Sequence, residues 1–385
     1  MRSFLRWTAA LAIIAIMLVS FLPPGKDPVV VPSVFRWGNS YWLEGEEQEA
    51  IQRNRIQRVY LKILDIDWNS ANGAHPVSKV PVPYQWRSYY SDRGYWTDRV
   101  ELVPCIYITN NTFLRITEEE VDELANNLLR KLRMERPEKI HGVMLDCDWS
   151  TKTKAKFFRL TRLMNDSLDV PLTVTVRLHQ FAQPTRTGVP PADRGMLMPY
   201  NVGRISEPGT VNSIFDHATA EPYFKNTKPY PLPLDIGLPA FSWGVQFRKG
   251  ALVGLLQEQY VNDALNAGLL GGEANGNLHV INENNSAMPE LHLGDMIRVE
   301  RITPETIAQV TALARTAVNS DTIAVAYFAS GSMNFQQLTE TDVRAGFTSF
   351  GQLRTTSVYA REDAMDSAAW SGADSAMPTI MDTTR

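Results

Sequence analysis

Two similar stretches set the fold of this chain, residues 58–68 (RVYLKILDIDW) and residues 140–149 (IHGVMLDCDW). Both are rich in apolar and β-branched residues, which favour buried strands. Both end in Asp-x-Asp-Trp, and side chains alternate along a strand, so the two Asp of each pair share one face. A charge packed against helices is costly, so we expect this face to line the inside or mouth of a closed sheet.

Similar strand signals recur along the chain, with helices or long connections between them. This alternation predicts an α/β fold, a single-domain (β/α)8 TIM barrel with long loops. A doubly wound open sheet is the alternative, but it would carry a Gly-rich phosphate loop after its first strand, where this chain has Trp-Gly-Asn-Ser. The predicted strands are residues 33–41, 58–68, 100–109, 140–149, 172–181, 195–202, a segment within 235–247, and 322–329. The predicted helices include residues 44–54, a segment from Thr117, 153–165, about 251–267, and 304–318.

The two ends of the chain fall outside this pattern. Residues 1–24 carry two Arg and then an apolar run that ends in Pro-Pro, as in an export signal. A retained N-terminal membrane anchor is the alternative. We therefore expect an exported protein, periplasmic or extracellular. If the N-terminal segment is retained as an anchor, it tethers the protein to the inner membrane. Residues 25–32 are expected to form a linker, 33–350 the barrel, and 351–385 a loosely ordered tail.

The composition narrows the class of protein. Hydrophobic residues make up 44% of the 385 residues and charged residues 21%, which excludes a disordered chain, a coiled coil and a collagen-like repeat. The chain has 38 Lys and Arg against 42 Asp and Glu, so bulk charge argues against a nucleic-acid partner. Cys105 and Cys147 fall inside predicted strands. Export would permit a disulfide between them, but two buried thiols are the favoured interpretation.

Candidate catalytic residues follow from the rule that barrel enzymes use the C-terminal ends of their strands. The candidates are Asp67, Asp146 and Asp148. Asp67 and Asp148 lie nearer the rim and are the stronger candidates. For Asp146, the alternative is a structural ion pair with Arg177, and the neighbouring Asp65 has a similar alternative with Lys62. Two acids at one mouth can supply the general acid and the base or nucleophile of glycoside hydrolysis.

Other strand ends carry candidate substrate-binding residues. Trp and Tyr rings offer flat surfaces for sugar rings, so we expect a carbohydrate substrate or ligand. For His179 the alternative is a core histidine with satisfied hydrogen bonds. Asp, Asp and His could also bind a divalent metal, but no His-x-His or His-x-x-x-His is present, and we expect no metal and no cofactor. The candidates are Arg177, His179, Tyr200, Asn201, Trp37, Trp243 and Gln246.

Two short runs resemble the chitinase-like glycoside hydrolases of family 18. DCDWS at residues 146–150 resembles the end of that family's D-x-x-D-x-D-x-E motif, and MPYN at residues 198–201 resembles its M-x-Y-D motif. Val143 replaces the first Asp, and Ser150 stands where the family has the Glu that protonates the leaving group. The resemblance implies that Asp148 matches the Asp that orients an N-acetyl group. It also implies that this chain uses another acid or does not hydrolyse.

A broader resemblance covers residues 33 to about 328. The runs VYLKILDIDW, MLDCDWS, VTVRLHQF, TGVPPADRGMLMPYN and YPLPLDIGLPAFSWGVQFR resemble a family of uncharacterised exported bacterial proteins of the Bacteroidetes type. This resemblance implies a chitinase-like barrel and export, and it assigns no catalytic residues.

Three functions follow from these residues. The first is an exported glycoside hydrolase-like protein that acts on a glycan through its strand-end carboxylates. The alternatives are a non-catalytic glycan-binding barrel and a metal-dependent hydrolase such as a deacetylase.

Overall fold

The computed structural model describes residues 27–38, 45–79, 100–134, 140–225, 228–275, 277–329, 335 and 338–356. The predicted leader at residues 1–24 lies outside these ranges, as do residues 357–385 of the predicted tail. No helix in the described ranges is both long enough and apolar enough to cross a membrane.

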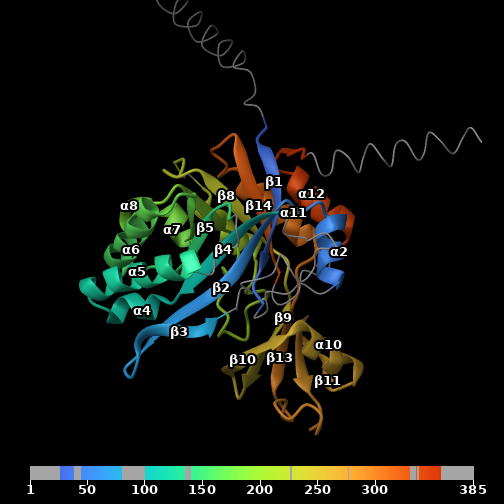
Figure 1. Ribbon diagram of the computed structural model, residues 1–385. Coiled ribbons are helices and arrows are strands. Elements are labelled where there is room, and N and C mark those ends of the chain that lie inside the picture. The colour runs from blue at the N-terminus through green and yellow to red at the C-terminus, as the bar shows by residue number, and fades with distance from the viewer. Residues whose placement is uncertain are drawn as a thin grey trace, which may run out of the picture.

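Eight parallel strands close into a barrel with helices on its outside, which confirms the predicted (β/α)8 fold (Figure 1). The barrel closes because β1 pairs with both β14 and β2. The barrel strands are β1 (Val29–Arg36), β2 (Arg58–Asn69), β4 (Glu101–Ile108), β5 (Val143–Asp146), β6 (Leu172–Arg177), β7 (Arg194–Met198), β8 (Leu234–Pro239) and β14 (Thr322–Ala329). The helices include α2 (Gly45–Arg53), α4 (Asn110–Arg115), α5 (Glu118–Met134), α6 (Lys154–Ser167), α7 (Leu178–Ala182), α8 (Pro184–Thr187), α9 (His217–Ala220), α11 (Pro304–Arg315) and α12 (Glu340–Thr348).

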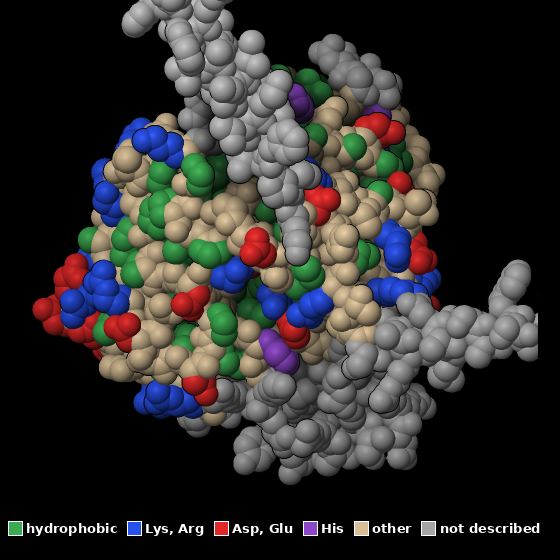
Figure 2. All heavy atoms as spheres, turned by 90° about the horizontal axis from the view of Figure 1, so that it is seen from above, with side chains coloured by type: hydrophobic (Ala, Val, Ile, Leu, Met, Phe, Trp, Pro, Cys, Tyr) green, Lys and Arg blue, Asp and Glu red, His purple; other side chains and the backbone are tan. Residues whose placement is uncertain are grey.

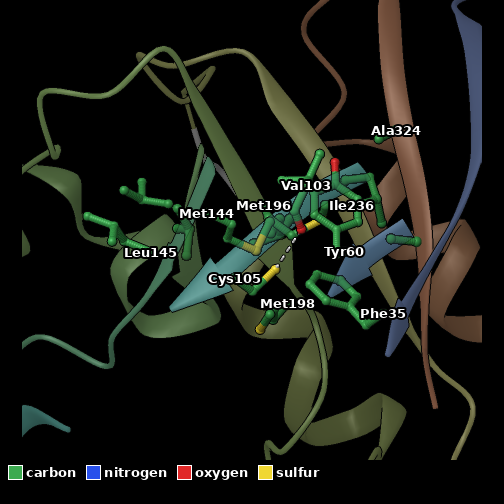
Figure 3. Packing of buried hydrophobic residues seen from close by; sticks show 14 of the residues in the cluster. Phe35, Tyr60, Val103, Cys105, Met144, Leu145, Met196, Met198, Ile236 and Ala324 are labelled. Carbon is green, nitrogen blue, oxygen red and sulfur yellow. Dashed lines mark hydrogen bonds between the residues drawn. The ribbon is translucent and has the colours of Figure 1, made fainter. Parts of the chain in front are cut away.

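Apolar side chains from successive strands fill the barrel (Figure 3). Cys105 pairs in register with Met144 and lies beside the interior residues, whereas Leu145 points away from them (Figure 3). Cys147 follows Leu145 by two residues, so alternation places it on the helix side of the sheet. Both cysteines are buried and free, which confirms the prediction of two buried thiols. They cannot pair because they face opposite sides of one sheet.

Strand β1 begins earlier than the sequence suggests. Residues 29–32 were expected in a linker, but Val29 and Pro32 pair in register with Thr322 and Val325 of β14. The prolines around this segment argued against a strand, because Pro has no N–H group to donate to a neighbouring strand. A strand tolerates Pro at positions where the N–H is not needed for pairing. At the other end, β15 (Gln352–Leu353) pairs with β1, so the first part of the predicted tail belongs to the sheet.

A second sheet interrupts the barrel between β8 and α11. It is antiparallel, has the order β10-β9-β13-β12-β11, and lies beyond the ends of the barrel strands in the lower part of Figure 1. It has a small core of its own, which includes Val261, Leu269 and Ile297. The sequence predicted only a helix at residues 251–267. The elements are β9 (Trp243–Arg248), β10 (Ala251–Gln257), α10 (Glu258–Asn266), β11 (Leu270–Asn275), β12 (Leu278–Ile281) and β13 (Met296–Glu300).

The opposite end of the barrel, where the strands begin, is held by ion pairs. Arg194 donates two hydrogen bonds to Asp235, at 2.7 and 3.0 Å, and Asp235 also accepts from the backbone N–H of Ala324 at 2.7 Å. These bonds connect β7, β8 and β14. Figure 2 shows this end of the molecule, where acidic and basic side chains are interspersed without a large area of one sign.

Candidate functional site

A pocket of about 260 Å³ opens where β5, β6 and β7 end. It brings together five of the predicted residues, namely Asp148, Arg177, His179, Tyr200 and Asn201. It also includes residues that the sequence did not indicate: Leu178, Val202 and Tyr223.

Asp148 is the exposed carboxylate of this pocket, and its Oδ1 accepts one long hydrogen bond, from Gln180 Nε2 at 3.5 Å. Its side chain is 57% exposed, and its Oδ1 lies 3.7 Å from His179 Nε2. The residues on either side, Cys147 and Trp149, are fully buried. Trp149 stacks on Phe157 of α6 at a ring distance of 5.2 Å, and this packing directs Asp148 toward the mouth, as the strand alternation predicted.

His179 reaches the pocket from a helix. The sequence predicted a strand through residue 181, but β6 ends at Arg177 and α7 begins at Leu178. Gln180 sets this turn, because its Oε1 accepts from the Arg177 backbone N–H at 2.7 Å and its Nε2 donates to the Trp149 carbonyl at 2.9 Å. The His179 side chain is half exposed, so the alternative of a core histidine is wrong.

Asp146 lies behind the pocket. It is 4% exposed and accepts a hydrogen bond from Thr175 Oγ1 at 2.7 Å, while Arg177 Nη2 is 3.7 Å away. Burial raises the pKa of Asp146, and the positive charge of Arg177 and the Thr175 hydroxyl offset only part of this effect. This position fits the structural pairing that was the alternative for Asp146.

Arg177 stays charged beside Asp146. Burial acts to lower the pKa of Arg177, but the charges of Asp146, Tyr200, Asp148 and Tyr107 together more than offset this effect, and the net pKa is raised. Its Nη1 also lies 3.2 Å from the Met198 sulfur.

Tyr200 forms part of the pocket wall from the end of β7. Its ring packs edge-on against Phe241 at 6.1 Å and tilted against Phe328 at 6.0 Å. Its hydroxyl is buried and has no hydrogen-bond partner among the described residues. Burial raises its pKa, so the hydroxyl keeps its proton. Asn201 follows with φ 58°, a left-handed conformation that Asn tolerates better than most residues, and its side chain is exposed.

An aromatic cluster extends from Tyr200 across the mouth. Trp37 is partly buried and lies 5.4 Å from Phe328 and 6.2 Å from Tyr107, between ring centroids. Lys62 Nζ lies 5.5 Å from the centre of the Trp37 ring. The cluster consists of Trp37, Tyr107, Tyr200, Phe241, Trp243 and Phe328.

Trp243 and Gln246 lie on β9 of the second sheet, not at the end of a barrel strand. The segment at residues 235–247 contains two strands because β8 stops at Pro239 and the chain then changes sheets. Trp243 still contacts the mouth through Phe241, at 5.1 Å between rings. Gln246 does not, because it is buried and donates to Asp295 Oδ2 and the Glu290 carbonyl, both at 2.8 Å. Its predicted placement at the mouth is therefore wrong.

Asp67 lies apart from the pocket. Its Oδ1 accepts from Thr109 Oγ1 at 2.6 Å, from the Trp68 backbone N–H at 2.8 Å and from Asn111 Nδ2 at 3.3 Å. These bonds lower the pKa of Asp67, with the Thr109 hydroxyl the largest cause. Thr109 is the N-cap of α4, so Asp67 ties the end of β2 to that helix. The structure does not bring Asp67 and Asp148 into one pocket.

A bulge in β2 explains the neighbouring ion pair. The register with β4 shifts between Lys62 and Leu64, which lets Lys62 and Asp65 meet although they are three residues apart. Lys62 Nζ lies 2.8 Å from Asp65 Oδ2, as the structural alternative for Asp65 predicted.

Ser150 belongs to the turn that starts α6. Its backbone N–H donates to Thr153 Oγ1 at 2.8 Å, and the two hydroxyls are 3.2 Å apart. Thr153 Oγ1 in turn donates to Asn110 Oδ1 at 2.6 Å. Ser150 does not line the pocket.

Of the pocket residues that the sequence missed, Tyr223 comes from a long connection. Tyr223 ends a short 3-10 helix, Glu221–Tyr223, and reaches the pocket only through tertiary folding. No local pattern marks it. Among the described residues, no three His, Cys, Asp or Glu side chains are grouped so that they could hold a metal ion.

Solved structures with the same barrel include three bacterial proteins. The spore cortex-lytic enzyme SleL of Bacillus cereus matches 87% of this chain and 77% of its own, with a TM-score of 0.50 and 11% identity. A chitinase of Chromobacterium violaceum matches 83% of this chain and 99% of its own, with a TM-score of 0.50 and 12% identity. A chitinase of Bacteroides thetaiotaomicron matches 84% and 97%, with a TM-score of 0.50 and 11% identity.

These likenesses confirm the chitinase-like barrel that the sequence resemblance implied. Because the sequences are only 11–12% identical, the likenesses show the fold alone. No model of a protein family matches the chain, and no curated protein matches its sequence.

Proposed function

We propose that this protein is an exported glycoside hydrolase-like barrel that binds a glycan at its mouth, with Asp148 as the principal acidic group. The observation that carries the proposal is the convergence of Asp148, Arg177, His179 and Tyr200 on one pocket at the strand ends. Barrel enzymes place their chemistry at this end. Three solved structures with the same fold are, by their names, two chitinases and a cortex-lytic enzyme.

The pocket residues divide between sugar binding and proton transfer. A cavity of about 260 Å³ accommodates a single sugar ring, and Tyr223 and the aromatic cluster present rings beside it. Asp148 and His179 carry the carboxyl and imidazole groups that general acid–base catalysis uses. Their 3.7 Å separation lets the carboxylate orient the imidazole, or lets both groups contact one glycosidic oxygen.

Replacing Asp148 tests this role. Asp148→Asn keeps the size of the side chain but cannot transfer a proton, so turnover of a glycan substrate should fall by about 10²–10⁴-fold. Asp122→Asn is the matched control, because Asp122 on α5 forms an exposed ion pair with Arg159 on α6, and neither residue lines the pocket. Unchanged turnover in Asp148→Asn, with the same substrate and control, would exclude the role.

A non-catalytic glycan-binding barrel is the second candidate. Ser150 occupies the position of the family's acid and is engaged in the first turn of α6. Calorimetry on ligands found with a glycan array separates the two candidates. Binding that depends on Asp148, with no product at any pH tested, would establish the binding protein and exclude the hydrolase.

Export is a separate part of the proposal. Its support is the pair of Arg followed by an apolar run in residues 1–24. Cell fractionation, together with sequencing of the mature N-terminus, checks it. Recovery of the full-length chain in the cytoplasm alone would contradict export.

A further inference from the structure

We infer that the inner corner of the pocket recognises a carboxylate carried by the sugar, so that the glycan is an acidic one containing a uronic acid. This inference rests on the proposed function and names its substrate class. Arg177 and Tyr200 both line the pocket, and the Arg177 charge acts on the Tyr200 hydroxyl, so the two groups lie close together; we call them the inner corner.

The Tyr200 hydroxyl is a buried donor without an acceptor among the described residues. Tyr200 is 3% exposed, lines the pocket, and has no hydrogen-bond partner for its hydroxyl among the described residues. A buried polar group without a partner costs free energy, and native proteins retain few of them without a reason. Its ring is held between Phe241 and Phe328, so the hydroxyl cannot turn away to find another partner.

The Arg177 guanidinium supplies further donors at the same corner. Within the described part of the chain, its side chain donates one hydrogen bond, to the Met198 sulfur at 3.2 Å. Asp146 Oδ1 is 3.7 Å from Nη2, too far for a hydrogen bond, and that oxygen is already occupied by Thr175 Oγ1. Arg177 therefore holds a positive charge next to Asp146 but keeps most of its N–H groups for another acceptor.

Two acidic groups face Arg177 and bear on the choice of ligand. Asp146 Oδ1 lies 3.7 Å from Arg177 Nη2 and accepts its hydrogen bond from Thr175 instead, so Asp146 leaves the guanidinium N–H groups available. Asp148 lies at the exposed rim, where water screens its charge and His179 lies 3.7 Å away. A sugar that carries a carboxylate and hydroxyl groups fits this arrangement. Its carboxylate would lie at the inner corner and its hydroxyls would donate to Asp148.

A carboxylate brings less negative charge to this corner than a phosphate ester does. The planar guanidinium pairs with the two oxygens of a carboxylate through parallel hydrogen bonds, and the Tyr200 hydroxyl adds a third donor. A phosphate ester would bring more negative charge toward Asp146 and Asp148.

Two glycosides that differ at one carbon test the inference. Methyl glucuronide has a carboxylate where methyl glucoside has a hydroxymethyl group, and glucose 6-sulfate is the third probe. Calorimetric or saturation-transfer titration of the full chain should give about tenfold or tighter affinity for the glucuronide than for the glucoside. Equal affinities, or tighter binding of glucose 6-sulfate, would overturn the inference.

Arg177 variants should remove the preference. Arg177→Met is expected to bring the affinity ratio of glucuronide to glucoside close to one, and Arg177→Lys to leave an intermediate ratio, because an ammonium keeps the charge without the planar fork. A ratio that is unchanged in both variants would overturn the role of Arg177.

Tyr200→Phe covers the case in which the Arg177 variants do not fold. It removes only an unpartnered hydroxyl, so the free protein should be as stable as the wild type or more so, while glucuronide affinity falls several-fold. Tyr230→Phe is the matched control, because the Tyr230 hydroxyl is also buried, has no partner among the described residues, and is not in the pocket lining. Equal glucuronide affinity in both variants would exclude Tyr200 as a ligand contact.

The proposed function and this inference fail in different ways. If neutral glycans bind in an Asp148-dependent manner and the glucuronide has no advantage, only the carboxylate corner is wrong. If no glycan of any charge binds, the proposed function is wrong as well.

Discussion

Asp146 and Asp148 are two residues apart on one strand end, yet their surroundings give them different tasks. Asp146 points into the barrel, where Thr175 and Arg177 hold it, and Asp148 extends past the last pair of β5 into the mouth. Depth decides between them, because one residue pair along a strand advances by about 6–7 Å, enough to pass from the packed interior to the rim. The carboxylate that can meet a ligand is therefore Asp148.

The stability contributed by Asp146 should depend on pH. Burial raises its pKa above the usual 3.8. A group of this kind contributes stability that is fully present below the unfolded pKa and is lost as pH rises through the folded pKa. Asp146→Asn cannot ionise, so the free energy of unfolding of the wild type minus that of the variant should decrease as the pH rises above about 4. Urea denaturation at several pH values checks this, and a difference that grows with pH would contradict it.

A buried ion pair on β13 of the second sheet contacts the connection that follows β7. Glu300 accepts from Arg298 Nε at 2.6 Å, and from Trp243 Nε1 and Ser213 Oγ, both at 2.7 Å. Arg298 also donates to the carbonyl groups of Ile205 and Glu207, in the connection that follows β7. The pair therefore joins β9 and β13 to the segment that continues from Asn201 at the pocket wall.

Glu300→Gln should destabilise this attachment. It leaves the fully buried Arg298 charge without a carboxylate, which costs about 3–5 kcal/mol of the free energy of unfolding. Arg204→Gln is the control, because the Arg204–Glu207 pair is solvent-exposed and its loss should not change the unfolding curve. Equal curves for the wild type and Glu300→Gln would show that the pair does not support the sheet.

At the scale of the molecule, the two ends of the barrel have separate roles. The end where strands begin is held by Arg194, Asp235 and the neighbouring ion pair of Arg58 and Glu101, at 2.6 Å. The other end carries the pocket and faces the second sheet (Figure 1). Barrel proteins often divide stability and function in this way.

Asp235→Asn should therefore affect stability without affecting the site. Asp235 is fully buried and is the partner of Arg194, so its loss is expected to cost about 3–5 kcal/mol on denaturation with urea. Ligand affinity of the folded fraction should equal that of the wild type, because the substitution lies at the opposite end from the pocket. An affinity change without a stability change would contradict this division.

The sequence predicted much of the site wherever strand periodicity continued to the strand end. Asp148, Arg177 and Tyr200 lie at the ends of β5, β6 and β7 in the expected order, so their meeting in one pocket follows from barrel geometry. Periodicity failed where the chain left the strand early or changed sheets. His179 lies on a helix, and Gln246 lies in the second sheet.

Local pattern determined that this chain forms alternating strands and helices and that a few carboxylates end its strands, because side-chain alternation depends only on neighbouring residues. Tertiary structure decided which of those carboxylates face one another. A bulge in β2 and the hydrogen bonds of Thr109 and Asn111 set Asp67 aside, and Tyr223 joins the pocket from a distant connection. These outcomes depend on contacts between residues far apart in the chain, which no local periodicity encodes.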